Sequence, residues 1–166
     1  LVGSAQAAEP SRVRIGDPLP ACLASVMNAD KRLDLAAHRS RVLYVDFWAS
    51  WCAPCAKAFP YLNRLDAEFR QRGLTIVGIS VDERLADAEH FLKRFPARFE
   101  TAHDGTGSCP RAYGVIGMPS SYLIDRRGKI RAIHIGFRDG DAVQRTQEIE
   151  RLLLETEDAG ATEMKR

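Results

Sequence analysis

The chain has 166 residues, of which 45% are hydrophobic and 28% are charged, and its formal net charge at pH 7 is +2. A chain of this length and composition forms one globular domain with a sizeable hydrophobic core. So small a net charge, without clusters of Lys and Arg, argues against nucleic acid as a partner. No apolar stretch approaches the roughly 18 residues of a transmembrane helix, so we expect no membrane span in this chain.

The first eleven residues resemble the end of a secretory signal peptide. Ala5-Gln6-Ala7 has the small-x-small pattern that precedes a cleavage site. Two other interpretations stay open: residues 1–11 form a flexible linker, or they end a membrane anchor that is not removed. We favour export, and we expect the folded domain to span residues 12–154.

The first half of that domain is predicted to begin with a β-hairpin. Turn-forming residues 28–31 separate segments 21–27 and 31–35, which we expect to pair. Residues 42–48 are almost continuously apolar, as in a strand that is covered on both faces. A helix over residues 53–70 follows. Its apolar residues share one stripe: Phe59, Leu62, Leu65 and Phe69.

The second half alternates strands and helices. Residues 74–81 are rich in β-branched side chains and predict a buried strand, and residues 85–95 predict a helix. Residues 121–124 and 130–135 flank a turn and predict an antiparallel hairpin, and residues 142–154 predict a closing helix. The apolar positions of the first helix are Leu85, Phe91, Leu92 and Phe95, and the expected buried face of the second consists of Val143, Ile149, Leu152 and Leu153.

This order of elements predicts an α/β fold. A strand–helix–strand unit implies a right-handed crossover and parallel pairing, and the later hairpin adds antiparallel strands. The result is a central mixed β-sheet flanked by helices on both faces, with the N-terminal hairpin as an extension. Residues 155–166 are polar and charged, and we expect them to form a flexible tail.

Two cysteines three positions apart, Cys52 and Cys55, follow the predicted strand directly and open the predicted helix. Unsatisfied N–H groups and the positive end of the helix dipole stabilise a thiolate at such a position, and the thiolate is the nucleophile. A structural zinc site usually needs four ligands, and the other cysteines, Cys22 and Cys109, stand alone. The pattern therefore predicts a redox pair, with no metal and no cofactor.

In this interpretation Cys52 attacks a partner disulfide and Cys55 resolves the mixed disulfide. The chemistry calls for an exposed sulfur at Cys52 and a shielded one at Cys55. Pro54 suits the first helical turn, because the N–H it lacks has no partner there. Ala53 and Pro54 place no His or Lys beside the thiolate, so we expect a moderately reducing pair, in the lower half of the range of about −120 to −270 mV.

Two segments carry a resemblance to a known family. Residues 45–55, Val-Asp-Phe-Trp-Ala-Ser-Trp-Cys-Ala-Pro-Cys, resemble the active-site segment of thioredoxin-fold proteins, and residues 117–125 resemble their cis-proline loop with its following strand. Residues 16–20, Gly-Asp-Pro-Leu-Pro, and 33–35, Leu-Asp-Leu, are similar to the TlpA-like family of bacterial extracytoplasmic thiol–disulfide oxidoreductases. The resemblance spans residues 16–154, implies a thioredoxin fold, and agrees with export to the periplasm.

Asp46 is an acid within the apolar strand. Burial raises the pKa of a carboxyl group, which suits it to exchange a proton with Cys55, and the resemblance implies that role. Its alternative is a side chain that turns outward to solvent or to a backbone partner. Glu83 stands where other TlpA-like proteins place such an acid, and it is equally well interpreted as an acid at a helix start.

The resemblance also implies a surface for substrate proteins. Pro119 matches the cis-proline that faces the disulfide and leaves the neighbouring backbone free to pair with an extended partner segment. Met118 then lines that groove, with Pro54 beside it. Trp51 is expected to be an exposed partner contact next to the first cysteine, whereas Trp48 is expected in the core.

Cys22 and Cys109 remain once the motif has taken the other two cysteines. In an oxidising compartment two free thiols are a liability, so we favour a second, structural disulfide between them. The alternative is two buried free cysteines that act as small apolar residues.

Two functions from different classes follow. The first is an extracytoplasmic protein-disulfide reductase whose partners are protein thiols and disulfides and a membrane or periplasmic electron donor. The family resemblance implies roles in haem attachment to cytochrome c or in copper-site assembly. The second is a Cu(I)-binding, metallochaperone-like module on the same fold, in which Cys52 and Cys55 bind the ion through soft thiolates.

Overall fold

The computed structural model describes residues 12–155, and the expectations for residues 1–11 and 156–166 lie outside the described part of the chain. Within it, six strands form one mixed sheet in the order β1-β4-β3-β2-β5-β6. At its centre β2 (Val42–Trp48) pairs in parallel with β3 (Leu74–Ser80) and antiparallel with β5 (Ser120–Ile124). The remaining strands are β1 (Ser25–Val26), β4 (Glu100–His103) and β6 (Ile130–Ile135).

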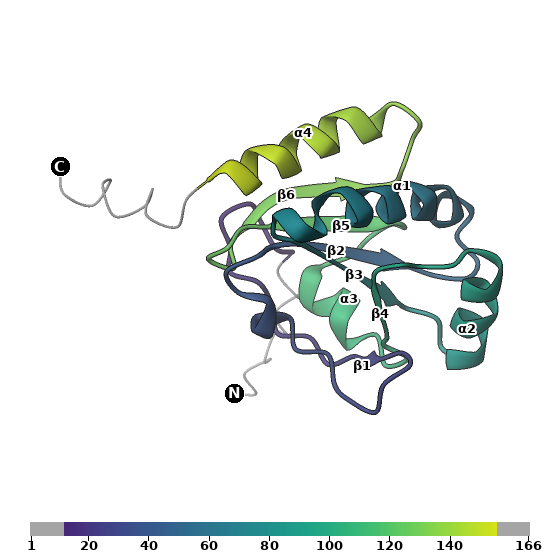
Figure 1. Ribbon diagram of the computed structural model, residues 1–166. Coiled ribbons are helices and arrows are strands. Elements are labelled where there is room, and N and C mark those ends of the chain that lie inside the picture. The colour runs from purple at the N-terminus through teal and green to yellow at the C-terminus, as the bar shows by residue number, and fades with distance from the viewer. Residues whose placement is uncertain (1–11, 156–166) are drawn as a thin grey trace, which may run out of the picture.

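Helices cover both faces of this sheet. The helices α1 (Ala53–Phe69) and α4 (Asp141–Leu154) lie on one side, and α3 (Ser108–Tyr113) lies on the other (Figure 1). The side chains of α2 (Leu85–Arg94) pack into the same apolar cluster as those of α1. Two short 3-10 helices, Leu35–His38 and Arg70–Arg72, complete the elements of the described residues. No helix within residues 12–155 is both long and apolar enough to cross a membrane.

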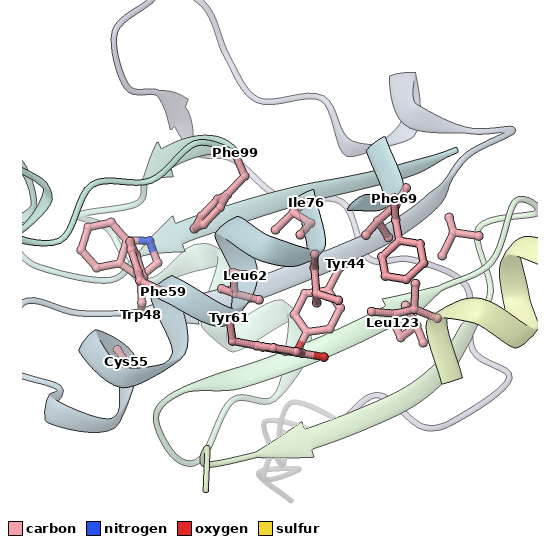
Figure 2. Packing of buried hydrophobic residues seen from close by; sticks show 14 of the residues in the cluster. Tyr44, Trp48, Cys55, Phe59, Tyr61, Leu62, Phe69, Ile76, Phe99 and Leu123 are labelled. Atoms are coloured by element: carbon pink, nitrogen blue, oxygen red, sulfur yellow. The ribbon is translucent and has the colours of Figure 1, made fainter. Parts of the chain in front are cut away.

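All seven residues of β2 are buried, because helices or loops cover the sheet above and below this strand. Tyr44 and Trp48 face the cluster of α1, whereas Val45 and Phe47 face the opposite cluster, as the pleat of a strand requires. The ring of Trp48 packs against Phe59 and Phe91 with centroid distances of 5.3 and 4.9 Å. Figure 2 shows Trp48 and Phe59 at the end of the core that also holds Cys55.

The main predicted elements are present. Strands β2, β3, β5 and β6 and helices α1, α2 and α4 match the predicted ranges to within one or two residues. The N-terminal hairpin is smaller than expected, with a single bridge between Ser25 and Arg32. Its first segment instead joins the main sheet, because β1 pairs antiparallel with the edge of β4.

The strand β4, the helix α3 and the 3-10 helix Leu35–His38 were missed, and one buried position was assigned wrongly. Val143 is 68% exposed, although it was predicted to be buried. In α4 the buried polar residue Arg145 lies four residues before Ile149, so the inward face of the helix passes through Arg145 rather than Val143.

A second disulfide joins Cys22 to Cys109 and ties the N-terminal segment to α3. Cys109 is fully buried in the cluster on the face of the sheet opposite α1. Next to it, the buried carboxylate of Asp104 accepts hydrogen bonds from the backbone N–H groups of Cys109 and Thr106, at 2.7 and 2.9 Å. The Cys22–Cys109 disulfide therefore fastens this six-residue helix to the N-terminal segment.

Candidate active site

The cysteine pair lies where β2 passes into α1. Cys52 is the N-cap of the helix, and its Sγ accepts a hydrogen bond from the N–H of Cys55 at 3.2 Å. The two sulfurs form a disulfide. Pro54 is exposed in the first helical turn, where its missing N–H leaves no bond unmade. The helix thus begins on the residue that the sequence identified as the nucleophile.

The accessibility of the two cysteines differs less than predicted. Cys55 is fully buried, as expected, but Cys52 is only 4% exposed, so the expectation of an exposed first cysteine is wrong for this disulfide state. The cause is the cap geometry, because Sγ turns inward toward the first turn of the helix and toward Cys55. Trp51, the preceding residue, is 69% exposed. Trp48 is fully buried in the core.

The loop before β5 lies beside the cysteine pair. Phe47 of β2 pairs with Ser120, so the residues before Ser120 flank the segment that leads from β2 to Cys52. The Met118–Pro119 peptide bond is cis. Met118 is partly buried against the cluster that contains both cysteines of the pair. The structure therefore brings Met118 and Pro119 to the same end of the molecule as the disulfide.

Asp46 is buried on the face of β2 that α1 covers, between Tyr44 and Trp48. Its Oδ1 accepts a hydrogen bond of 2.9 Å from the Ser121 hydroxyl, and its Oδ2 has no hydrogen-bond partner among the described residues. Burial raises the pKa of Asp46 to about 7, and the Ser121 hydrogen bond and the Arg145 charge oppose that rise. The alternative of an outward-facing Asp46 is therefore wrong.

Glu83 is exposed, and its neighbour Asp82 occupies the interior instead. Glu83 directly precedes Arg84, the N-cap of α2, so it lies at the start of that helix but outside its first turn. The carboxylate of Asp82 accepts hydrogen bonds from the backbone N–H and the hydroxyl of Ser50, and from the hydroxyl of Ser80. Sequence reasoning missed Asp82, although its place after the buried strand β3 was visible.

A mixed sheet with an exchangeable disulfide at the N-terminus of its first long helix, beside a cis-proline loop, defines a thioredoxin-fold protein. More narrowly, the chain belongs to the Redoxin family, whose model matches residues 14–152.

Several relatives carry names that describe disulfide chemistry. The chain is 34% identical over 100 residues to the thiol-disulfide oxidoreductase ResA of Bacillus thuringiensis subsp. konkukian, a match that spans 60% of this chain and 58% of that relative. It is 30% identical over 128 residues to ResA of Geobacillus thermodenitrificans, spanning 77% of this chain and 73% of the relative.

Solved structures agree with the fold. A putative thiol:disulfide interchange protein DsbE from Chlorobium tepidum has a TM-score of 0.82 and 39% identity, and the match covers 85% of this chain and 99% of the other. A putative protein disulfide isomerase from Bacteroides thetaiotaomicron has a TM-score of 0.77 and 26% identity, with 86% and 92% covered.

Proposed function

We propose that this protein is an extracytoplasmic thiol–disulfide oxidoreductase that reduces disulfides of partner proteins through Cys52 and Cys55. The observation that carries the proposal is the disulfide at the N-cap of α1, where Cys55 is fully buried, Cys52 is 4% exposed and the neighbouring Trp51 is exposed. Helix N–H groups and the helix dipole favour a thiolate at that cap once the disulfide is reduced.

The reaction begins from the reduced pair. The Cys52 thiolate attacks one sulfur of the partner disulfide, and the other partner sulfur leaves as a thiolate and takes up a proton. Cys55 then loses its proton and attacks Cys52 Sγ. The Cys52–Cys55 disulfide forms, and the second partner sulfur leaves as a thiol after protonation. Two electrons have passed to the partner, and a dithiol donor at the membrane or in the periplasm must return them.

Asp46 is the base that accepts the proton of Cys55 in this scheme. It lies on the strand face covered by the helix of Cys55, and its pKa of about 7 lets it hold either protonation state near neutral pH. The free Oδ2 supplies an acceptor with no competing hydrogen bond among the described residues. Glu83, which is exposed, has the weaker geometric support for such a role.

Four residues would form the docking edge for the partner: Trp51, Pro54, Met118 and Pro119. Trp51 and Pro54 are exposed on either side of Cys52, and the cis bond before Pro119 lies beside the end of β2. An exposed indole ring offers apolar area at small conformational cost, which suits a transient contact.

The proposed extracytoplasmic location and the proposed role in maturation are supported by the second disulfide and by the relatives. A disulfide away from the active site, between Cys22 and Cys109, is typical of oxidising compartments. The resemblance to TlpA-like proteins and the relatives named ResA favour a reductase that keeps cysteines reduced during maturation of cytochrome c or of a copper site.

An insulin-reduction assay, with a glutathione redox titration of the pair, tests the proposal. We expect catalysis by the wild-type protein and none by Cys52→Ser, while Cys55→Ala should trap partners as mixed disulfides. The matched control Cys22→Ser/Cys109→Ser keeps the active pair. Inactive wild-type protein that binds Cu(I) in a 1:1 ratio would instead support the metallochaperone alternative and overturn the proposal.

A further inference from the structure

A buried arginine lies beneath the active-site end of the sheet. Arg145, on the inward face of α4, is 3% exposed. Its guanidinium donates hydrogen bonds to the Tyr44 hydroxyl at 3.2 Å, to the Ser121 hydroxyl at 3.3 Å and to the backbone carbonyl of Gly136 at 2.6 Å. The guanidinium carbon also lies 5.2 Å from the ring centroid of Phe137. Burial of a cation costs free energy unless hydrogen bonds or a nearby anion compensate for the lost hydration.

Ser121 connects this arginine to the candidate base. The Ser121 hydroxyl accepts a hydrogen bond from Arg145 and donates one to Asp46 Oδ1 at 2.9 Å. Asp46 and Ser121 are directly opposite each other in the β2–β5 pair. On the other side, the residue opposite Asp46 is Gly78, which has no side chain. Strand β3 therefore supplies no cation at this position, and the buried positive charge beside Asp46 comes from α4.

We propose that Arg145 is a positioning residue for Asp46: it orients the carboxylate through the Ser121 hydroxyl and supplies the positive charge that keeps Asp46 available as a base for Cys55. This inference rests on the proposed function. Without the cation, a carboxylate in a fully buried site would stay protonated at neutral pH and could not take up the thiol proton.

The other ionisable groups around Arg145 are consistent with this assignment. Tyr44 on β2 and Tyr61 on α1 have pKa values raised by burial, so both remain neutral. Burial and the charge of Arg145 lower the pKa of His134 on β6, although its Nε2 lies 2.8 Å from Glu148 Oε2.

The acids near Arg145 are placed on its outer side. Asp141 Oδ2 lies 3.5 Å from the guanidinium, and the Asp141 side chain is half-exposed. Glu148 Oε2 lies beside His134 Nε2, at 2.8 Å. Among the described residues, the carboxylate that Arg145 reaches through a buried hydroxyl is Asp46.

The site offers a matched control. Arg138 lines the same cavity of about 290 Å³ as Arg145 and Asp141, but its side chain is exposed. Arg138→Met therefore removes a nearby guanidinium without removing a contact to Ser121. Arg145→Lys keeps the buried charge and loses the planar fork, and Ser121→Ala removes only the linking hydroxyl.

The test is a ¹³C NMR titration of the Asp46 carboxyl group in the oxidised protein, with the signal assigned from Asp46→Asn. We expect a midpoint near 7 in the wild type and an upward shift of about 1 unit or more in Arg145→Met. Ser121→Ala should shift it upward by less, Arg145→Lys should restore most of the difference, and Arg138→Met should match the wild type. An unchanged midpoint in Arg145→Met overturns the inference. If that variant does not fold, an unchanged midpoint in Ser121→Ala does so.

Kinetics separate this inference from the function on which it rests. The pH profile of the resolving step should move upward in Arg145→Met, and Arg145→Met should have no further effect in an Asp46→Asn background. A wild-type protein that does not reduce insulin overturns the proposed function, whereas the carboxyl titration still decides the role of Arg145. An active wild type with an unshifted profile in Arg145→Met overturns the inference alone.

Discussion

The Asp82 carboxylate holds Ser50 by both its backbone N–H and its hydroxyl, at 3.0 and 2.7 Å. Ser50 stands two residues before Cys52, so this contact fixes the segment that leads to Cys52 to the end of β3. Trp48 and Ser80 are opposite each other at the ends of the two parallel strands, which brings the residues that follow them together. A carboxylate that accepts several hydrogen bonds is a stronger anchor than a neutral group.

Asp82→Asn should loosen this segment. The amide keeps the size of the side chain but loses the charge. Its NH₂ group is a hydrogen-bond donor that replaces one acceptor oxygen, so it faces the donors of Ser50 without forming a hydrogen bond. We expect the free energy of unfolding to fall by about 1–3 kcal/mol and the Ser50 amide to lose protection from hydrogen exchange. Urea unfolding and exchange NMR measure both. Glu89→Gln, at an exposed position on α2, is the matched control; equal losses in the two variants would contradict the anchor.

The raised pKa of Asp46 makes stability depend on pH. Because its folded pKa of about 7 lies above the ordinary value of 3.8, the folded state keeps the proton to higher pH than the unfolded state. The contribution of Asp46 to stability is therefore present at low pH and is lost as pH rises from about 4 to about 7, by at most about 4 kcal/mol. Urea unfolding of wild type and Asp46→Asn across this range measures the difference in their free energies of unfolding. As pH rises, the wild type should become less stable relative to Asp46→Asn.

Asp104 provides the opposite sign within the same molecule. Burial favours the neutral acid, but hydrogen bonds from Thr106, Cys109 and Ser108 outweigh it and hold the pKa of Asp104 below its ordinary range. Its contribution to stability is present at neutral pH and is lost as pH falls below about 4. Compared with the wild type, Asp104→Asn should therefore be least stable near neutral pH. If both aspartates gave slopes of the same sign, our account of their surroundings would be wrong.

The parts of the site that a local pattern encodes were predicted from the sequence. Cys52 and Cys55 follow a strand that is apolar except for Asp46, and both the strand and the helix start are set by neighbouring residues. The missed elements lack such a pattern. β4 has the sequence Glu-Thr-Ala-His, and its strand conformation comes from pairing with β3, while the six residues of α3 depend on a disulfide to residue 22.

Buried polar residues were the other gap, because their partners are distant in the sequence. Asp82 and Ser50 are 32 residues apart, and Arg145 and Tyr44 are 101 apart. One signal for Arg145 was available: Ile149 and Leu152 define the inward face of α4, and the position one turn before Ile149 is Arg145. Giving that position to the nearest apolar residue, Val143, produced the error.

The Cys22–Cys109 disulfide should contribute to stability without taking part in exchange. The two residues are 87 positions apart, so the bond restricts a long loop in the unfolded chain. Replacing both cysteines with alanine should cost about 2–4 kcal/mol of unfolding free energy while insulin reduction persists. Titration of the denatured wild type without reductant should find no free thiols, and two free thiols would show that the bond does not form.

Gly78 should not tolerate a side chain, because Trp48 and Phe99 fill the space beside Asp46. A Cβ at this position would lie 2.9 Å from Phe99 Cε2 and 3.1 Å from Trp48 Nε1. Both side chains are buried in the core, so Gly78→Ala should displace rings and lower the free energy of unfolding by about 1–3 kcal/mol. Denaturant unfolding, followed by Trp fluorescence, measures the loss and reports the ring displacement.

Gly140→Ala is the matched control for that substitution. A Cβ at Gly140 meets no atom within 4 Å, and the backbone there has a φ of −80°, which any residue adopts. The change should therefore leave stability within about 0.5 kcal/mol of the wild type. A Gly78→Ala variant as stable as Gly140→Ala would mean that the rings of Trp48 and Phe99 can move apart. In that case β3 could carry a side chain beside Asp46, and Gly78 would no longer explain why the positive charge near Asp46 comes from Arg145 of α4.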